Sequence, residues 1–177
     1  PLDDAVSHYF KLKTNHREWY TDEEKLKHNN RLAEKLDVLM FRYIQKNDAD
    51  FEKFFLKFYV FPYNNWASMN RKHYDHVLRF ESLDEDFAKA IELLGMELVR
   101  PLESRNTTSG RSRNWVSYYT PRIIPRAKKV FGPFMKEWGY EMPEEWGKYE
   151  ETPTNQALYN FLNMFRMVYW KYIRAYI

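Results

Sequence analysis

The chain has 177 residues, with 28 Lys and Arg against 25 Asp and Glu, for a net charge of +3. This length suits one domain, and a composition of 44% apolar and 30% charged residues excludes a disordered or fibrous chain. The absence of cysteine excludes a disulfide framework, a cysteine zinc site and a thiol nucleophile, and it favours a reducing, cytoplasmic setting.

The first predicted element is a helix from Pro1 to about Lys13. Proline suits the first helical position, and Asp3 and Asp4 complement the positive end of the helix dipole. One face of this helix is apolar, with Leu2, Val6, Tyr9 and Phe10. The helix is also a functional candidate, because its N-terminal amides and the Ser7 hydroxyl could bind an anion.

Two more helices are predicted in the first 60 residues. Thr21 and Glu24 form a capping box, and an apolar stripe carries the helix to about Gln45: Leu26, Leu32, Leu36, Leu39 and Tyr43. A shorter helix over residues 50–60 is expected to end before Pro62, with its aromatic side chains in the core.

A strand and a capped helix are predicted next. His76 to Phe80 is short, apolar and rich in β-formers, while Ser82 and Glu85 form a capping box for a helix that Gly95 closes. Together they make a βα unit, so the predicted fold class is α/β and helix-rich, with few strands. Because one strand cannot form a sheet alone, its partner strands are expected outside this sequence.

Basic residues gather in the second half of the chain. Between Arg105 and Lys136 there are eight basic residues and no acidic one. Either they form a solvated face with acidic partners in the first half, or they bind phosphate, sulfate or a polyanion. The loop from residue 101 to 114 carries Arg105, Arg111 and Arg113, whose guanidinium groups can each pair two oxygens of one phosphate.

Two helices are predicted after this loop. The first begins at Pro121 behind a Thr120 cap, is kinked near Gly132 and Pro133, and ends at Gly139. An irregular connector leads to an amphipathic helix over residues 155–177, with an apolar face of Leu158, Leu162, Phe165, Tyr169 and Tyr172. This last helix either packs on the domain or lies on a membrane surface.

Motifs for the common catalytic sites are absent from the sequence. It contains no phosphate loop, dinucleotide loop, serine elbow or zinc helix of the usual patterns. His73 and His76 are three residues apart, but no third spaced ligand accompanies them, so no metal is predicted.

Three passages carry a family resemblance. They are PLDDAVSHYFKLK at the start, DHVLRFESLDEDFAKAIELLG from Asp75, and RNTTSGRSRNWVSYYTPRIIPRAKKVFGPFMKEWGY from Arg105. In order and spacing they resemble the sulfotransferases that use 3′-phosphoadenylyl sulfate (PAPS), in their bacterial and carbohydrate-type branch. The resemblance implies the C-terminal portion of a P-loop-like sulfotransferase fold, with a partial sulfotransferase domain at 1–152 and a C-terminal amphipathic helix at 153–177.

The resemblance also implies roles for particular residues. Ser7 would hydrogen-bond the 3′-phosphate of PAPS, and the loop with Arg105, Arg111 and Arg113 would close over that phosphate and the adenine. Asp4 departs from the family, where many members have arginine. PAPS would be the co-substrate, without a metal, and the acceptor would be a hydroxyl or amine of a small molecule or glycan.

The sequence has no counterpart of the family's 5′-phosphosulfate loop or of its usual catalytic acid or base. The arginine that accompanies Ser7 in the family would stand two places before Pro1. We therefore expect these 177 residues to be part of a longer enzyme, or a truncated gene product, and not to catalyse alone. The catalytic residues stay unassigned.

A different class of function fits the same basic segment. Trp115, Tyr118 and Tyr119 could stack on bases while the basic side chains contact phosphates, as in a nucleic-acid or polyanion binding module. A net charge of +3 is small for a protein that binds nucleic acid, so the charge gives this function only weak support.

Overall fold

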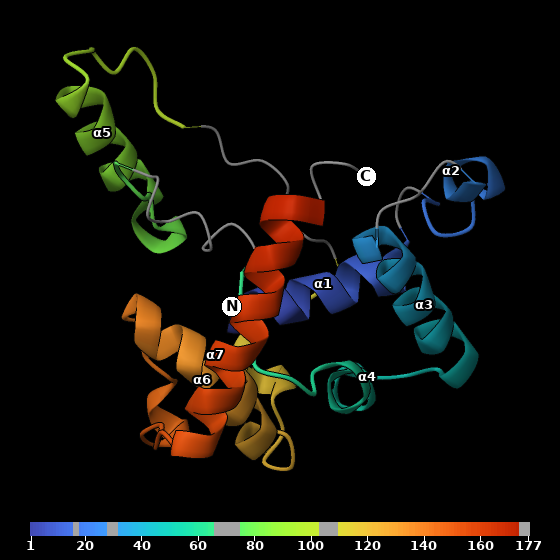
Figure 1. Cartoon of the computed structure of the whole chain (residues 1–177). Coiled ribbons are helices and arrows are strands. Elements are labelled where there is room, and N and C mark those ends of the chain that lie inside the picture. Colours follow the sequence, from blue (N-terminus) through green and yellow to red (C-terminus); the bar gives the residue numbers. More distant parts are fainter. Residues whose placement is uncertain (16–17, 28–31, 66–74, 103–109, 174–177) are drawn as a thin grey trace. The chain divides into compact units, whose positions relative to one another are not determined.

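The computed structural model describes residues 1–15, 18–27, 32–65, 75–102 and 110–173. The chain divides into two units, one formed by residues 1–64 with 108–177 and the other by residues 65–107 (Figure 1). Within the described ranges the regular secondary structure is helical throughout.

The first half of the larger unit has α1 (Leu2–Thr14), α2 (Glu23–Lys27), α3 (Leu32–Asn47) and α4 (Phe51–Phe58). α1 packs against α3, and α4 packs against both. The predicted first helix and the predicted helix over residues 50–60 are confirmed. Asp50 caps α4 by accepting a hydrogen bond from the Lys53 amide at 2.8 Å, because a carboxylate satisfies an amide that the first turn leaves unpaired.

The predicted second helix begins later than expected and is assigned as α2 and α3. Thr21 is not its cap, since the Thr21 hydroxyl donates to the Glu18 carbonyl at 3.1 Å. The Asp22 carboxylate accepts from the Glu24 amide at 3.1 Å instead. The capping residue is therefore Asp22, whose negative charge also suits the positive end of the helix.

The second half of the larger unit has η3 (Trp115–Tyr118), α6 (Ile124–Trp138), η4 (Glu144–Trp146), α7 (Pro153–Val168) and η5, a π-helical turn (Tyr169–Ile173). α6 starts three residues after Pro121 because the Thr120 hydroxyl binds the Glu52 carboxylate rather than capping a helix. Gly139 ends α6 with a φ of 67°, as predicted.

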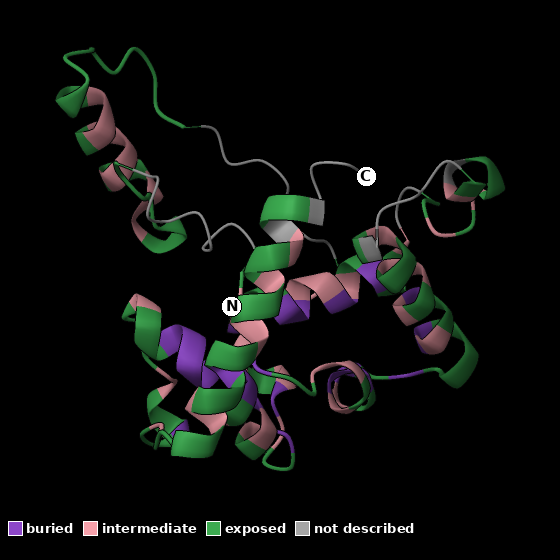
Figure 2. Ribbon diagram, viewed as in Figure 1, coloured by how far each residue is buried: buried purple, intermediate pink, exposed green. Residues whose placement is uncertain are grey.

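Aromatic rings build the core of the larger unit, where Figure 2 shows the buried parts of α1 and α6. Phe55 stacks on Tyr59 with ring centres 4.8 Å apart, and the Tyr119 ring meets Phe51 edge to face at 5.1 Å. The hydroxyls of the buried tyrosines also form hydrogen bonds. That of Tyr9 donates to the Ala49 carbonyl at 2.8 Å, and that of Tyr119 donates to the Leu2 carbonyl at 2.9 Å. These two bonds tie α1 to segments distant in sequence.

The predicted α/β fold class is wrong for the described part of the chain, which contains no strand. In the smaller unit His76 to Arg79 is irregular, and η2 (Phe80–Ser82) leads into α5 (Leu83–Leu93). Phe80 is 83% exposed, and the Arg79 amide donates to the Asp86 carboxylate at 3.0 Å. Without a neighbouring strand to receive its amides and cover its side chains, the segment binds the helix that follows it.

The helix predicted after this segment is confirmed as α5, but its cap differs. The Ser82 hydroxyl donates to the Asp86 carboxylate at 2.8 Å rather than accepting from a backbone amide. The Arg79 amide and this hydroxyl hold the pKa of Asp86 below its usual value. Gly95 follows α5 with a φ of 67°.

Among the helices that the structure describes, none combines the length and the apolarity needed to cross a bilayer.

Candidate functional site

One side of α1 carries a ridge of four side chains. Asp3, Ser7, Phe10 and Thr14 follow each other at intervals of three or four residues, so they lie next to one another along the helix. The opposite side is buried in the core and holds Leu2, Ala5, Val6, Tyr9 and Leu12. The core contacts therefore set which way Ser7 faces.

The segment from Gly110 to Tyr118 packs on this ridge. A Cβ atom added at Gly110 would lie 3.5 Å from Cγ2 of Thr14, and the Tyr118 ring meets Phe10 edge to face at 5.1 Å. Gly110 has a φ of 79°, which residues with a side chain rarely adopt. The glycine thus permits the turn that leads the chain into the arginine segment.

The next residue, Arg111, forms a two-pronged ion pair with Asp3. Nη2 donates to Oδ2 at 3.2 Å and Nη1 donates to Oδ1, between residues 108 positions apart in sequence. Asp3 precedes Ser7 by four residues, about 5–6 Å between Cβ atoms on a helix. The Arg111 guanidinium therefore lies about one helical turn from Ser7, and both side chains are half-buried.

The other predicted residues are placed differently. Arg113 is exposed, and its carbonyl accepts from the Trp115 amide at 3.0 Å. Its neighbour Ser112 donates its amide to the Tyr118 hydroxyl at 2.8 Å, which fixes the backbone beside Arg111. Arg105 lies outside the described residues, as does His73. Of the four predicted residues, Arg111 is thus the one that the structure ties to α1, through Asp3, which lies one helical turn before Ser7.

Several other basic side chains of the acid-free stretch have partners. Arg122 pairs with Glu52 at 2.9 Å, Lys136 with Glu151, and Lys128 donates to the Lys148 carbonyl at 3.2 Å. The Glu52 pair agrees with the interpretation of a solvated face whose partners lie in the first half. These bonds reduce the charge available to a polyanion.

The sequence did not predict a half-buried pair of His8 with Asp37, next to Ser7 on α1. His8 Nε2 and Asp37 Oδ1 are 2.9 Å apart, and the pair joins α1 to α3. Burial, and then the nearby Asp37 carboxylate, raise the pKa of Tyr20 to about 12. No local sequence signal links residues 29 positions apart, so only the packing of the two helices reveals this pair.

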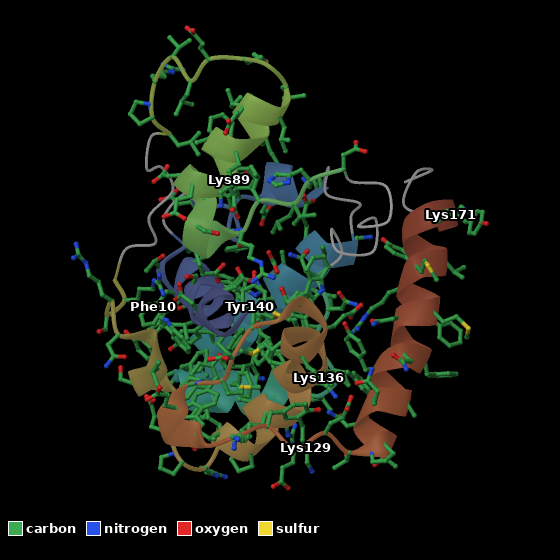
Figure 3. All side chains as sticks on the ribbon, turned by 90° about the vertical axis from the view of Figure 1, so that its left-hand side faces the viewer. Phe10, Lys89, Lys129, Lys136, Tyr140 and Lys171 are labelled. Carbon is green, nitrogen blue, oxygen red and sulfur yellow. The ribbon has the colours of Figure 1, made fainter. Side chains whose placement is uncertain are left out.

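A separate cavity of about 610 Å³ lies between α6 and the connector that follows it. Its lining includes Gly132, Lys136, Tyr140 and Tyr149, and Figure 3 labels Lys136 and Tyr140. A Cβ atom at Gly132 would lie 2.3 Å from the Tyr149 ring. Gly132 in the middle of the helix is the one sequence signal that the Tyr149 ring approaches the backbone closely. Neither Ser7 nor Arg111 lines this cavity.

Comparisons with protein-family models, curated proteins and solved structures find no match to this chain.

The α1 ridge offers the chemistry of an anion site. A serine hydroxyl donates one hydrogen bond and a guanidinium pairs two oxygens, which suits a tetrahedral oxyanion better than a lone cation does. The carboxylate that occupies the guanidinium is Asp3, itself an anion. An incoming phosphate would therefore compete with Asp3 or share the guanidinium with it.

Proposed function

We propose that the chain carries the 3′-phosphate-binding part of a PAPS-dependent sulfotransferase. One observation supports the proposal: Ser7 and Arg111, which the family resemblance assigns to the same phosphate, lie about one helical turn apart through the Asp3 pair. The two residues are more than 100 positions apart in the sequence, so the chain connectivity alone does not place them near each other.

In this proposal the chain binds the nucleotide and does not transfer the sulfuryl group by itself. Ser7 and Arg111 hold the 3′-phosphate, while the sequence has no counterpart of the family's 5′-phosphosulfate loop. In the complete enzyme the sulfuryl group would pass in line to a hydroxyl or amine of a small molecule or glycan. Positioning and electrostatic stabilisation would supply the rate, by analogy with phosphoryl transfer. A cytoplasmic location belongs to the same proposal and rests on the cysteine-free sequence.

Calorimetric titration with adenosine 3′,5′-bisphosphate tests this function. Adenosine 5′-monophosphate, which lacks the 3′-phosphate, is the matched ligand, and we expect the bisphosphate to bind at least about tenfold more tightly. Ser7→Ala should weaken bisphosphate binding at least about tenfold, since it removes one hydrogen bond to a charged group. Ser117→Ala removes an exposed hydroxyl that donates to the Asn114 carbonyl and should leave binding unchanged.

Arg111→Ala should abolish the preference for the bisphosphate. Arg122→Ala is its control, because Arg122 is also paired with a carboxylate, that of Glu52 on α4 instead of one on α1. Thermal unfolding of each variant separates lost binding from lost folding. Equal affinity for the two nucleotides, or steeply salt-dependent binding of single-stranded DNA without nucleotide binding, would contradict the proposal in favour of a nucleic-acid module.

A further inference from the structure

The last long helix, α7, is attached to the larger unit through its polar side. Asn155 donates from Nδ2 to the Lys129 carbonyl at 2.9 Å, and Arg166 donates from Nη2 to the Pro62 carbonyl at 2.6 Å. Between them the Tyr159 hydroxyl is bonded to the Glu137 carboxylate and accepts from Asn64 at 3.2 Å. These bonds determine which side of α7 faces α6.

The opposite side of α7 is apolar and exposed. It presents Leu158, Phe161, Met164, Phe165 and Val168, and the two phenylalanines are 56% and 55% exposed. Figure 2 shows mostly exposed residues along α7, and Figure 3 shows side chains directed away from the rest of the unit. An apolar surface of this kind on a folded protein marks an interaction site.

The spacing of this face favours another helix as the partner. Leu158, Phe161, Phe165 and Val168 follow each other at intervals of three, four and three residues, the pattern of a coiled-coil seam. Tyr172, four residues further on, is also exposed. Side chains with this spacing can pack, knobs into holes, against a second helix that has the same spacing of apolar residues.

We propose that α7 pairs with α7 of a second copy of this chain, antiparallel, around a two-fold axis. Charge decides the direction. The described end of η5 carries exposed Lys171, which Figure 3 labels. At the other end, exposed Glu150 stands just before the first turn of α7, next to Glu151, which is bonded to Lys136. A parallel pair would set Lys171 against Lys171, whereas an antiparallel pair sets each lysine at the acidic end of the other helix. The two copies then bury identical faces, as a two-fold interface requires.

An anionic lipid surface suits this face less well. Interfacial helices carry Lys and Arg on the polar side, in contact with headgroups. Here the polar side faces α6, and its Arg166 is bonded to the Pro62 carbonyl. The exposed carboxylate of Glu150, just before the helix, would also be repelled by anionic lipid.

Sedimentation analysis of the full chain tests the pairing. At about 100 μM, well above a micromolar dissociation constant, we expect a mass twice that of the chain. Phe161→Glu should weaken dimerisation at least about tenfold, because it places a charge in the buried seam. Phe80→Glu, at a still more exposed site in the smaller unit, should leave the dimer intact.

Because the natural chain has no cysteine, introduced cysteines test the direction. An antiparallel seam centred between Phe161 and Phe165 brings Leu158 of one copy to Val168 of the other. Leu158→Cys and Val168→Cys should therefore cross-link when mixed under oxidation, and neither should cross-link by itself. This readout does not depend on whether Phe161→Glu folds.

Three outcomes would overturn the proposal. The first is a monomer at this concentration, and the second is efficient cross-linking of Leu158→Cys alone, which requires a parallel pair. The third is a monomer that co-sediments with phosphatidylserine vesicles, together with loss of this co-sedimentation in the Phe161→Glu variant. That result would assign the apolar face of α7 to lipid binding.

Discussion

At the scale of single residues, the site depends on which anion the Arg111 guanidinium holds. In the free chain that anion is the Asp3 carboxylate, on the same ridge of α1 as Ser7. Asp3 therefore keeps the arginine oriented while it also competes with any phosphate. The sequence shows the acid in the first turn of a helix, where the dipole alone would explain it.

Replacing Asp3 by asparagine tests this competition. We expect Asp3→Asn to tighten binding of adenosine 3′,5′-bisphosphate about five- to tenfold, because the guanidinium no longer trades one full negative charge for another. Asp4→Asn is the matched control, since it removes the same charge from the next, exposed position. Calorimetric titration measures both. Equal gains in the two variants would show a general charge effect instead of release of Arg111.

At the scale of elements, some helix ends agreed with local signals, whereas the predicted caps Thr21, Ser82 and Thr120 and the predicted strand did not. α4 is capped by Asp50 and α6 is closed by Gly139, because caps are satisfied within one turn of the chain. The predicted strand at His76 to Phe80 is irregular, because a strand needs a neighbour that local sequence cannot supply. The Arg79 amide donates to the Asp86 carboxylate of the following helix instead.

The fit between α6 and its connector leads to a prediction at this scale. Gly132→Ala should improve helix propensity by up to about 1 kcal/mol, but its Cβ would meet the Tyr149 ring at 2.3 Å. Overpacking costs more, so we expect a net loss of about 1–2 kcal/mol in the free energy of unfolding.

Urea denaturation measures this loss, and the double variant Gly132→Ala with Tyr149→Ala is the control. Removing the ring should relieve the clash, so the alanine at 132 should be neutral or stabilising in that background. A loss of the same size in both backgrounds would mean that the Tyr149 ring is not its cause.

At the scale of the whole molecule, buried tyrosines make stability depend on pH. Burial raises the pKa of Tyr119 well above its usual value of 10, and burial raises those of Tyr59 and Tyr63 as well. The unfolded chain therefore loses these protons first as pH rises. The stability they contribute is complete below pH 10 and is lost as pH rises from there toward the folded pKa.

We accordingly expect the free energy of unfolding to fall above pH 10. A fully buried tyrosine contributes a slope of up to about 1.4 kcal/mol per pH unit. Tyr119→Phe should make the slope shallower, whereas Tyr172→Phe, at an exposed position, should leave it unchanged. Urea denaturation between pH 8 and 11 provides the slopes. An unchanged slope in Tyr119→Phe would contradict burial as the cause.

The apolar face predicted for the last helix, which included Leu162 and Tyr169, differs from the exposed apolar face that α7 presents. Local sequence did predict where α1 and α4 lie and where α6 ends. These follow from contacts within a few residues. Tertiary structure alone decided that Arg111 meets Asp3 beside Ser7, that His8 meets Asp37, and that α7 turns its polar side inward. Each of these pairings joins residues distant in sequence, and no local energy term distinguishes them from the alternatives until the core has set the helices in place.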